Sequence, residues 1–444
     1  MLTFPLKSLP FFQQIKRFVI AYSGGLDSHV LLHTIAGLRN TVGNTDIVAL
    51  HINHGLSEKA GEWVIHCKKQ CETLGITFAT INVDAKNKSG ESPEAAAREV
   101  RYQAFREFMQ LGDCLLTAHH QDDQAETLLI QLLRGAGPRG LAAMPRYANF
   151  AEGWHARPLL NFSRDELQAY AEHISSQKKL SWIEDESNSD TRFDRNFLRH
   201  EIIPALKLRF PGMTATLSRS ARLCAEATEL LAHVAEDDTK QVQRDDGTFS
   251  VTGLRALGEV RARNLLHQYC RDRGLSTPSA VQLQCIWDEV IGASEDSNPV
   301  VHWEGGEARR YRDMLFMGFP LTAHDATLSL PWSGQGTLLI PQLGELYGKP
   351  VVGMGIAFQV LAEKQIDIRF RQGGEKLRPV GRAGHHALKK LFQEAGIPPW
   401  LRERIPLLYT DGQLLAVAGQ WVAHEAAAQP GEAGICLHWS PMVQ

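Results

Sequence analysis

The chain lacks any long apolar stretch and any leader-like start. In its 444 residues no run approaches the roughly 18 consecutive apolar residues that a membrane-spanning helix requires. The segment from Met1 to Arg17 has neither the apolar core nor the small-residue cleavage site of a secretory signal. We therefore expect a cytoplasmic protein that has no membrane partner.

Cysteine spacings typical of metal sites are also missing. The seven cysteines are an odd number, are scattered along the chain and form no CxxC pair. This spacing argues against a zinc finger. We expect reduced thiols that lie mostly in the protein core.

The chain has little net charge, but the charges are unevenly distributed. A net charge of −3 argues against a uniformly positive surface. Basic residues nevertheless outnumber acidic ones in 190–222 and in 364–404, whereas acidic residues dominate 226–259. This pattern fits a polyanion that touches the protein at selected places, although an ordinary solvated surface gives the same pattern.

A glycine pair follows the first apolar run. Residues 18–22 are apolar and β-rich, residues 29–38 have the apolar spacing of a helix, and Ser23-Gly24-Gly25-Leu26-Asp27-Ser28 lies between them. A glycine turn at a helix N-terminus offers backbone N–H groups to a phosphate. The segment matches neither GxxxxGK[ST] nor GxGxxG, so we expect a different kind of phosphate site. By composition alone, such a segment is often only a turn.

Three side chains of this loop add to the expected phosphate site. The Ser23 and Ser28 hydroxyl groups can donate hydrogen bonds to phosphate oxygens. The Asp27 carboxylate would repel phosphate, so Mg²⁺ between the two anions is the natural bridge.

The order of strand-like and helix-like segments predicts an α/β fold. Apolar strand patterns at 18–22, 47–52, 77–83 and 114–118 alternate with helical patterns at 29–38, 58–74, 93–110 and 123–134. Strands that are apolar on both faces indicate a doubly wound, Rossmann-like parallel sheet covered by helices. We expect this N-terminal domain to span 1–213, a helical domain 214–327, and a small α+β domain 328–444.

Polar clusters fall at three predicted strand ends. They are 23–28, 51–54 and 119–123, and ligands bind beyond the carboxyl ends of parallel strands. Asp123 and Glu126 are three residues apart, so their carboxylates share one helix face and can hold Mg²⁺ or an amine. An acidic first turn that only complements the helix dipole is the alternative. Arg98 and Arg101 share a helix face in the same way and can reach phosphate together.

The glycine loop resembles the SGGxDS signature of the PP-loop ATP pyrophosphatase superfamily. Further segments resemble one family of it, tRNA(Ile)-lysidine synthetase, along nearly the whole chain. These segments are Ala96–Tyr102, Thr117–Thr127, Leu133–Gly137, Gly140–Leu141, Glu184–Asn188, Arg195–His200 and Gly396–Arg402. Ser57 stands where that family usually has arginine.

The resemblance implies a reaction in two steps. The position-2 carbonyl oxygen of the wobble cytidine, in the CAU anticodon of tRNA(Ile), attacks the α-phosphate of ATP and releases pyrophosphate. The ε-amine of free L-lysine then displaces AMP and forms lysidine, which changes decoding from AUG to AUA. The helical and C-terminal domains are then expected to bind the tRNA. The sequence leaves a homodimer open.

The resemblance also assigns site residues. ATP is expected at Ser23, Gly24, Gly25, Leu26, Asp27, Ser28 and His51, with Mg²⁺ at Asp27 and Asp123. The expected catalytic residues are Asp27, Arg98, His119, Asp123 and Glu126. Lysine and tRNA are expected at Arg101, Asp123, Glu126, Arg195 and Arg199.

Two other functions stay open on the sequence. One is tRNA thiolation by another PP-loop enzyme, although Cys67 and Cys71 are a poor fit to a sulfur-carrying pair because they lie four residues apart in a predicted helix. The other is a non-catalytic protein that binds RNA or senses a nucleotide. Incorporation of labelled lysine into tRNA distinguishes all three.

Overall fold

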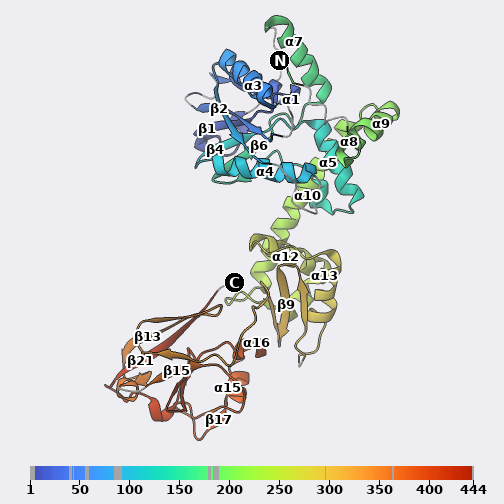
Figure 1. Cartoon of the computed structure of the whole chain (residues 1–444). Helices are drawn as coiled ribbons and strands as arrows, with labels where there is room; N and C mark the ends of the chain where they lie inside the picture. The colour runs from blue at the N-terminus through green and yellow to red at the C-terminus, as the bar shows by residue number, and fades with distance from the viewer. Residues whose placement is uncertain are drawn as a thin grey trace. The chain divides into compact units, whose positions relative to one another are not determined.

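The computed structural model forms two compact units, Met1–Leu231 and Ala232–Gln444 (Figure 1). It describes residues 6–39, 43, 45–55, 60–84, 93–178, 182–183, 190–295, 297–362 and 365–442. Ser57 and the segment Glu184–Asn188, both singled out in the sequence, lie outside the described residues.

The first unit alternates strands and helices, as the sequence predicts. Its elements are β1 Arg17–Ala21, α1 Leu26–Gly37, β2 Asp46–Asn53, α3 Ala60–Leu74, β3 Thr77–Asn82, α4 Pro93–Phe108, β4 Asp113–Leu116, α5 Gln121–Leu133, α6 Pro138–Leu141, β5 Tyr147–Phe150, β6 Gly153–Ala156, α7 Arg164–Lys178, α8 Asp194–Phe197, η4 Leu198–Ile202 and α9 Ile203–Arg209. Helix α10, Met213–Val242, begins in this unit and continues into the second.

The sheet of the first unit has the strand order β3-β2-β1-β4-β6-β5. Its strands pair in parallel except β5, which runs antiparallel to β6 at the edge. From β1 the chain first builds outward through β2 and β3, and then places β4 on the other side of β1. The loops after β1 and β4 therefore border the point where the strand order reverses, which is where such sheets bind ligands.

Both faces of this sheet are covered, which explains its apolar strands. Phe18 and Ile20 of β1 pack in a core that includes residues of α1, α3 and α7. Val19 faces the opposite way, into a core with Ala104 and Phe105 of α4. Alternating residues of a strand point to opposite faces, so each face needs its own apolar set.

The second unit is helical at first and then built of antiparallel sheets. Its elements after α10 are β7 Phe249–Ser250, α11 Val251–Leu257, α12 Glu259–Asp272, α13 Ala280–Cys285, η5 Ile286–Ile291, β8 Val300–Trp303, β9 Gly306–Tyr311, β10 Met314–Gly318, β11 Leu330–Trp332, β12 Thr337–Ile340, β13 Gly344–Val352, β14 Ile356–Ala357, α14 Phe358–Leu361, β15 Ile366–Arg369, β16 Lys376–Leu377, β17 His386–Ala387, α15 Leu388–Glu394, α16 Pro399–Arg402, β18 Leu407–Thr410, β19 Gln413–Val417, β20 Trp421–Val422 and β21 Ala433–Pro441.

One part of the middle region is not helical, contrary to the simple helical domain expected over 214–327. Strands β8, β9 and β10 join β7 in a four-stranded antiparallel sheet. Val301 and Trp303 are buried on one face of β8 while His302 is exposed, and Gly305 takes φ +74° in the turn to β9. This alternation over only four residues is a weak signal beside the long helical patterns.

The predicted fold class, a doubly wound sheet followed by a helical domain and a small α+β domain, is confirmed: the structure has a mostly parallel N-terminal sheet, a mainly helical middle and antiparallel C-terminal sheets. The three domain ranges stay a prediction. None of the helices in the described part of the chain combines the length and the apolar character that a bilayer crossing requires.

Candidate active site

The glycine loop joins β1 to α1 in the form that the sequence predicts. Gly24 takes φ +87°, and a Cβ on it would lie 2.7 Å from Ile183 Cδ1 and 2.8 Å from Cys67 Sγ. Gly25 begins helix α1 without a capping side chain, so the N–H groups of the first turn are directed at the space beyond β1. The Ser23 and Ser28 hydroxyl groups lie 3.1 Å apart beside them. The loop therefore has the form that a phosphate-binding turn requires, and we call it the anion site.

Asp27 lies in the first turn of α1, at the edge of this anion site. Its Oδ2 is 3.6 Å from His120 Nε2 and 3.8 Å from Arg164 Nη1. Burial raises the pKa of Asp27, but the His120 hydrogen bond and the positive charges of His120, Arg164 and Arg199 outweigh burial and lower it. The carboxylate is therefore ionised, and its buried Oδ1 has no hydrogen-bond partner in the described part of the chain.

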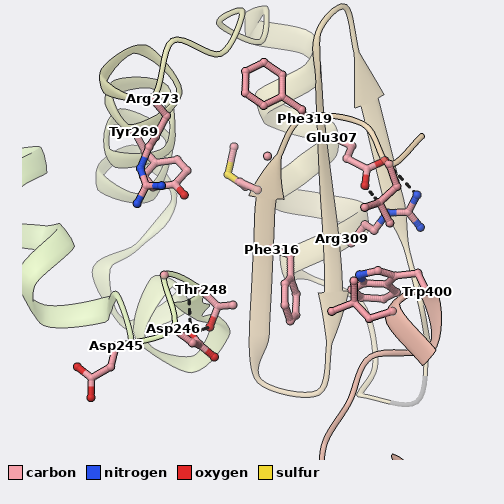
Figure 2. Close-up of a pocket in the computed structure, with 15 residues that line it drawn as sticks. Asp245, Asp246, Thr248, Tyr269, Arg273, Glu307, Arg309, Phe316, Phe319 and Trp400 are labelled. Carbon is pink, nitrogen blue, oxygen red and sulfur yellow. Dashed lines mark hydrogen bonds and ion pairs between the residues drawn. The ribbon is translucent and has the colours of Figure 1, made fainter. Parts of the chain in front are cut away.

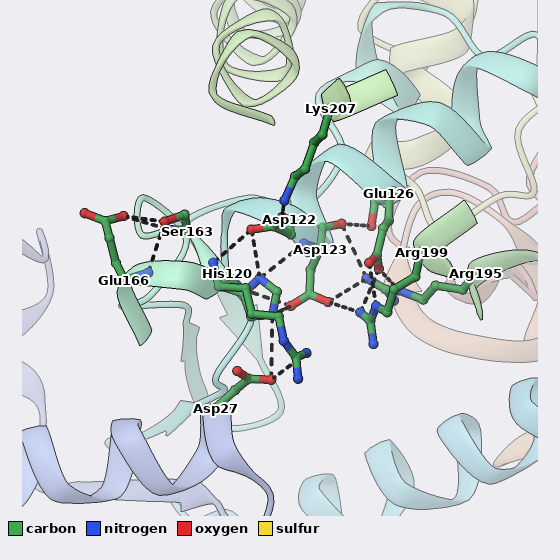
Figure 3. A network of polar contacts seen from close by, with 12 residues as sticks. Asp27, His120, Asp122, Asp123, Glu126, Ser163, Glu166, Arg195, Arg199 and Lys207 are labelled. Atoms are coloured by element: carbon green, nitrogen blue, oxygen red, sulfur yellow. Dashed lines mark hydrogen bonds and ion pairs between the residues drawn. The ribbon is translucent and has the colours of Figure 1, made fainter. Parts of the chain in front are cut away.

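Four charged side chains form the centre of a polar network (Figure 3). Glu126 Oε2 accepts from Arg195 Nε at 2.7 Å, and Glu126 Oε1 accepts from Arg199 Nε at 2.7 Å. Asp123 Oδ1 accepts from the Nη2 atoms of both arginines, at 3.3 and 3.0 Å. Helices α5 and α8 and the π-helical turn η4 thus bring together the predicted residues Asp123, Glu126, Arg195 and Arg199.

His120 connects this network to Asp27 (Figure 3). It begins α5 in a reciprocal cap: its backbone N–H donates to Asp123 Oδ2 at 3.0 Å, and Asp123 N–H donates to its Nδ1 at 3.4 Å. Burial lowers the pKa of His120, but the carboxylates of Asp123, Asp27 and Asp122 outweigh burial and raise it. At the rim, Asp122 Oδ1 accepts from Lys207 Nζ at 2.7 Å.

A second polar group, with no carboxylate, lies at the end of β4. Thr117 Oγ1 lies 2.8 Å from His119 Nδ1 and 2.8 Å from His155 Nε2. The Arg157 guanidinium donates from Nη2 to His155 Nδ1 at 3.3 Å and from Nη1 to the Pro145 carbonyl at 2.7 Å. We call Arg157, His155, Thr117 and His119 the imidazole relay.

Both histidines of the relay are neutral. Burial lowers the pKa of His155 to about 3, and the charges of Arg157 and Arg98 act in the same direction. Burial also lowers the pKa of His119 well below its ordinary value, with the charges of Arg157, Arg98 and Arg195 and the neighbouring His155 acting the same way.

The structure places the remaining predicted residues on β2 and α4. His51, at the end of β2, is buried and donates from Nδ1 to the Tyr22 carbonyl at 2.9 Å. Burial is the main cause of its lowered pKa. Arg98 lies over the Tyr102 ring on α4, 4.8 Å from its centroid. Burial lowers the pKa of His54, and the charge of Arg101 lowers it further.

The carboxylates of the site fit a metal ion that is held partly by the protein and partly by the phosphates of a bound substrate. Among the described residues no three His, Cys, Asp or Glu side chains converge as a complete metal site. Asp27 offers the unpartnered Oδ1, whereas both oxygens of Asp123 already accept hydrogen bonds. Mg²⁺ is commonly bound through one or two carboxylates together with substrate phosphates, so Asp27 beside the anion site fits it.

Sequence reasoning missed several members of the site. Arg164 and Lys207 contact Asp27 and Asp122 from α7 and α9, and nothing in their local sequence distinguishes them from solvated surface residues. His155 and Arg157 had a usable signal, because they are polar residues in an apolar segment at the end of a strand.

The second unit contains a pocket of about 430 Å³ (Figure 2). Aromatic and basic side chains line much of it, together with three acids. Arg309 lies over the Trp400 ring, 5.4 Å from its centroid, and also pairs with Glu307 at 2.7 Å. Phe316 meets Trp400 edge to face, 5.3 Å between centroids.

Three family models match the chain, one within the first unit and two within the second. Residues 5–206 match a family model described as a PP-loop domain. Residues 249–316 match a TilS substrate binding domain, and residues 366–439 a TilS substrate C-terminal domain.

Relatives match over nearly the full length. The chain is 42% identical over 425 residues to the tRNA(Ile)-lysidine synthase of Methylococcus capsulatus, covering 95% of this chain and 96% of that protein. It is also 42% identical over 428 residues to the tRNA(Ile)-lysidine synthase of Coxiella burnetii, covering 96% of this chain and 93% of that protein.

Proposed function

Because the chain belongs to the tRNA(Ile)-lysidine synthase family, we propose that the loops after β1 and β4 form its active site. The protein is an ATP-dependent PP-loop ligase that converts a cytidine of tRNA(Ile) to lysidine. The observation that carries the assignment of the site is the convergence of the anion site with the network of Asp27, His120, Asp123 and Glu126.

The first step adenylates the base. The position-2 oxygen of the wobble cytidine attacks the α-phosphorus of ATP, the bond to the bridging oxygen breaks, and pyrophosphate leaves. The N–H groups of the first turn of α1, with the Ser23 and Ser28 hydroxyl groups, hold the phosphates. Arg98 and Arg101 on α4 supply positive charge for the departing pyrophosphate.

Asp27 is the proposed main ligand for Mg²⁺, with Asp123 as the second carboxylate. The unpartnered Oδ1 of Asp27 supports this role. When bound, the ion neutralises charge on the phosphate oxygens. The lowered pKa of Asp27 keeps its carboxylate available as a ligand at neutral pH.

The second step joins lysine to the base. The lysine nitrogen bonds to carbon 2, the carbon–oxygen bond breaks, and AMP leaves with the oxygen. Asp123 and Glu126 bind the ε-ammonium group and accept the proton that makes the amine nucleophilic, since free lysine has a pKa near about 10.4.

The two arginines connect the steps. All four carboxylate oxygens of Asp123 and Glu126 accept hydrogen bonds, most of them from Arg195 and Arg199. Lysine must therefore displace these guanidinium groups, and the phosphates of ATP are the anions able to draw them away. We expect ATP and lysine to strengthen one another's binding.

The second unit is the proposed site of tRNA discrimination. The CAU anticodon does not by itself distinguish tRNA(Ile) from methionine tRNA, so contacts elsewhere on the RNA are required. Tyr269, Arg273 and Trp400 line a pocket of a size for an unstacked base. A cytoplasmic location and a homodimer stay predictions, the latter open to sedimentation analysis.

The test is a single assay with ATP, labelled lysine and total tRNA. We expect label in tRNA and one AMP per lysine joined. Thiolation leaves the tRNA unlabelled and releases AMP independently of lysine, and nucleotide binding without catalysis gives neither label nor AMP.

The variant Gly24→Ala tests the anion site within this assay. A Cβ at φ +87° between Ile183 and Cys67 displaces the loop, so we expect the KM for ATP to rise about 10-fold, the equivalent of one weakened charge-assisted contact. Gly37→Ala is the matched control. Gly37 is the last residue of α1, and a Cβ on it meets no atom within 4 Å, so this variant should behave as wild type. An unchanged KM in Gly24→Ala would place ATP elsewhere.

A further inference from the structure

The imidazole relay contains two residues that the sequence analysis did not place in the site. His155 and Arg157 lie on and just after β6, outside the segments whose resemblance to the family is described above. Leu115 of β4 pairs with His155 of β6, and Thr117 N–H donates to the Ala156 carbonyl at 3.2 Å. Because strand side chains alternate, His155 and Thr117 lie on the same face of the sheet as Leu115.

The direction of the hydrogen bonds in the relay follows from its first member. A guanidinium has only donors, so His155 Nδ1 must accept from Arg157. A neutral His155 then carries its proton on Nε2 and donates it to Thr117 Oγ1. The Thr117 hydroxyl is buried and has one proton, which finds its acceptor at His119 Nδ1. His119 therefore carries its own proton on Nε2.

We infer that Arg157, His155 and Thr117 are positioning residues that hold His119 as a neutral imidazole with Nε2–H as its donor. The inference rests on the proposed role of His119 in the active site. It goes further, because it specifies what His119 does: it donates a hydrogen bond to an oxygen that gains charge, and it does not act as the base that deprotonates lysine.

The surroundings of His119 support this assignment. The groups whose charges act on it are Arg157, Arg98 and Arg195, all positive, together with neutral His155. They come from the segment after β6, from α4 and from α8. Burial disfavours a proton added to His119, and these positive charges act in the same direction, whereas a neutral N–H donor adds no net charge. Tyr102 of α4 packs against His155, 6.0 Å between ring centroids, and limits its movement.

The chemical consequence is that charge stabilisation and proton transfer are carried out by different residues after β4. A neutral N–H donor stabilises negative charge on a phosphate oxygen or on the departing AMP without exchanging a proton. Proton transfer is then left to the carboxylates of Asp123 and Glu126.

The experiment compares Thr117→Val with Thr117→Ser. Valine has the shape of threonine but neither accepts from His155 nor donates to His119, whereas serine retains the hydroxyl. We expect Thr117→Val to lower kcat about 10- to 100-fold, as is usual when the partner that orients a functional histidine is lost. The KM for ATP should stay within about twofold of wild type, because His119 is proposed to act after ATP has bound. Thr117→Ser should retain most of the activity.

The tautomer is measured directly on full-length protein labelled with nitrogen-15 in histidine. The His119 signals are identified by their loss in His119→Gln. We expect a protonated Nε2 and an unprotonated Nδ1 in wild type and Thr117→Ser, and a mixture of tautomers in Thr117→Val.

Two results would overturn the inference: a proton on Nδ1 of His119 in the wild-type protein, or full kcat in a folded Thr117→Val variant. The wild-type spectrum decides the matter even if Thr117→Val does not fold. Full turnover by His119→Gln would instead refute the proposed role of His119 in the reaction, while the spectrum would still report whether the relay sets its tautomer.

Discussion

The network of α5 and the imidazole relay, the two polar groups after β4, differ in the charges that surround their buried side chains. In the network of α5, the Glu126 side chain is 1% exposed, and its carboxylate pairs with Arg195 and Arg199. In the imidazole relay, His119 and His155 are buried among positive charges and stay neutral. One group therefore loses stability when a partner is removed, and the other when a proton is added. The comparison indicates that burial, the largest cause of the lowered pKa of His119 and His155, is reinforced by the positive charges around them, whereas the buried Glu126 carboxylate has two guanidinium partners.

Removing the charge of Glu126 should give the largest effect. Glu126→Gln removes the more buried of the two carboxylates that pair with Arg195 and Arg199, so we expect a loss of about 3 kcal/mol in the free energy of unfolding. Lysine-dependent AMP release should fall as well. Urea denaturation and the lysine assay measure the two effects.

Glu166→Gln is the matched control for this loss. Glu166 is exposed, and within the described part of the chain its carboxylate accepts from the N–H and hydroxyl of Ser163 alone. Its variant should lose no more than about 1 kcal/mol. Equal losses in the two variants would contradict the distinction between a buried charged centre and an exposed cap.

Adding a proton to the relay should give the next largest effect. The pKa of His155 is about 3 in the folded protein against an ordinary value of 6.5. Between these values the unfolded chain binds the additional proton, so this group makes the protein less stable as the pH falls below 6.5. His155→Gln retains an acceptor for Arg157 and a donor for Thr117, but it does not titrate.

We therefore expect the stability of His155→Gln, relative to wild type, to rise by about 2 kcal/mol between pH 6.5 and pH 5. Urea denaturation at several pH values measures the difference. Parallel curves for the two proteins would show that His155 is not held neutral.

Removing the ion pair between Lys207 and Asp122, at the exposed rim of the network, should give the smallest effect. Lys207 is 36% exposed and pairs with Asp122, which also accepts from the backbone N–H of Arg164. Lys207→Gln should cost less than about 1 kcal/mol in thermal unfolding, and added salt should reduce the difference further. A loss as large as that of Glu126→Gln would mean that the rim is as tightly coupled as the centre.

The local parts of this protein follow from its sequence. Glycine at Gly24 is required by a positive φ and by two close neighbours, and the alternation of apolar strands and helices predicts the sheet. The pairing of Asp123 with Glu126 on one helix face follows from their spacing alone.

Only the tertiary structure decided which partners these residues meet. Arg195 and Arg199 lie about 70 positions beyond Glu126, and His155 lies 38 positions beyond Thr117. A hydrogen bond across such a distance depends on strand order and helix packing, which periodicity does not encode. The sequence thus determined the glycine loop after β1 and the carboxylates after β4, whereas the fold decided that these carboxylates meet arginines and that the neighbouring histidines are buried among positive charges.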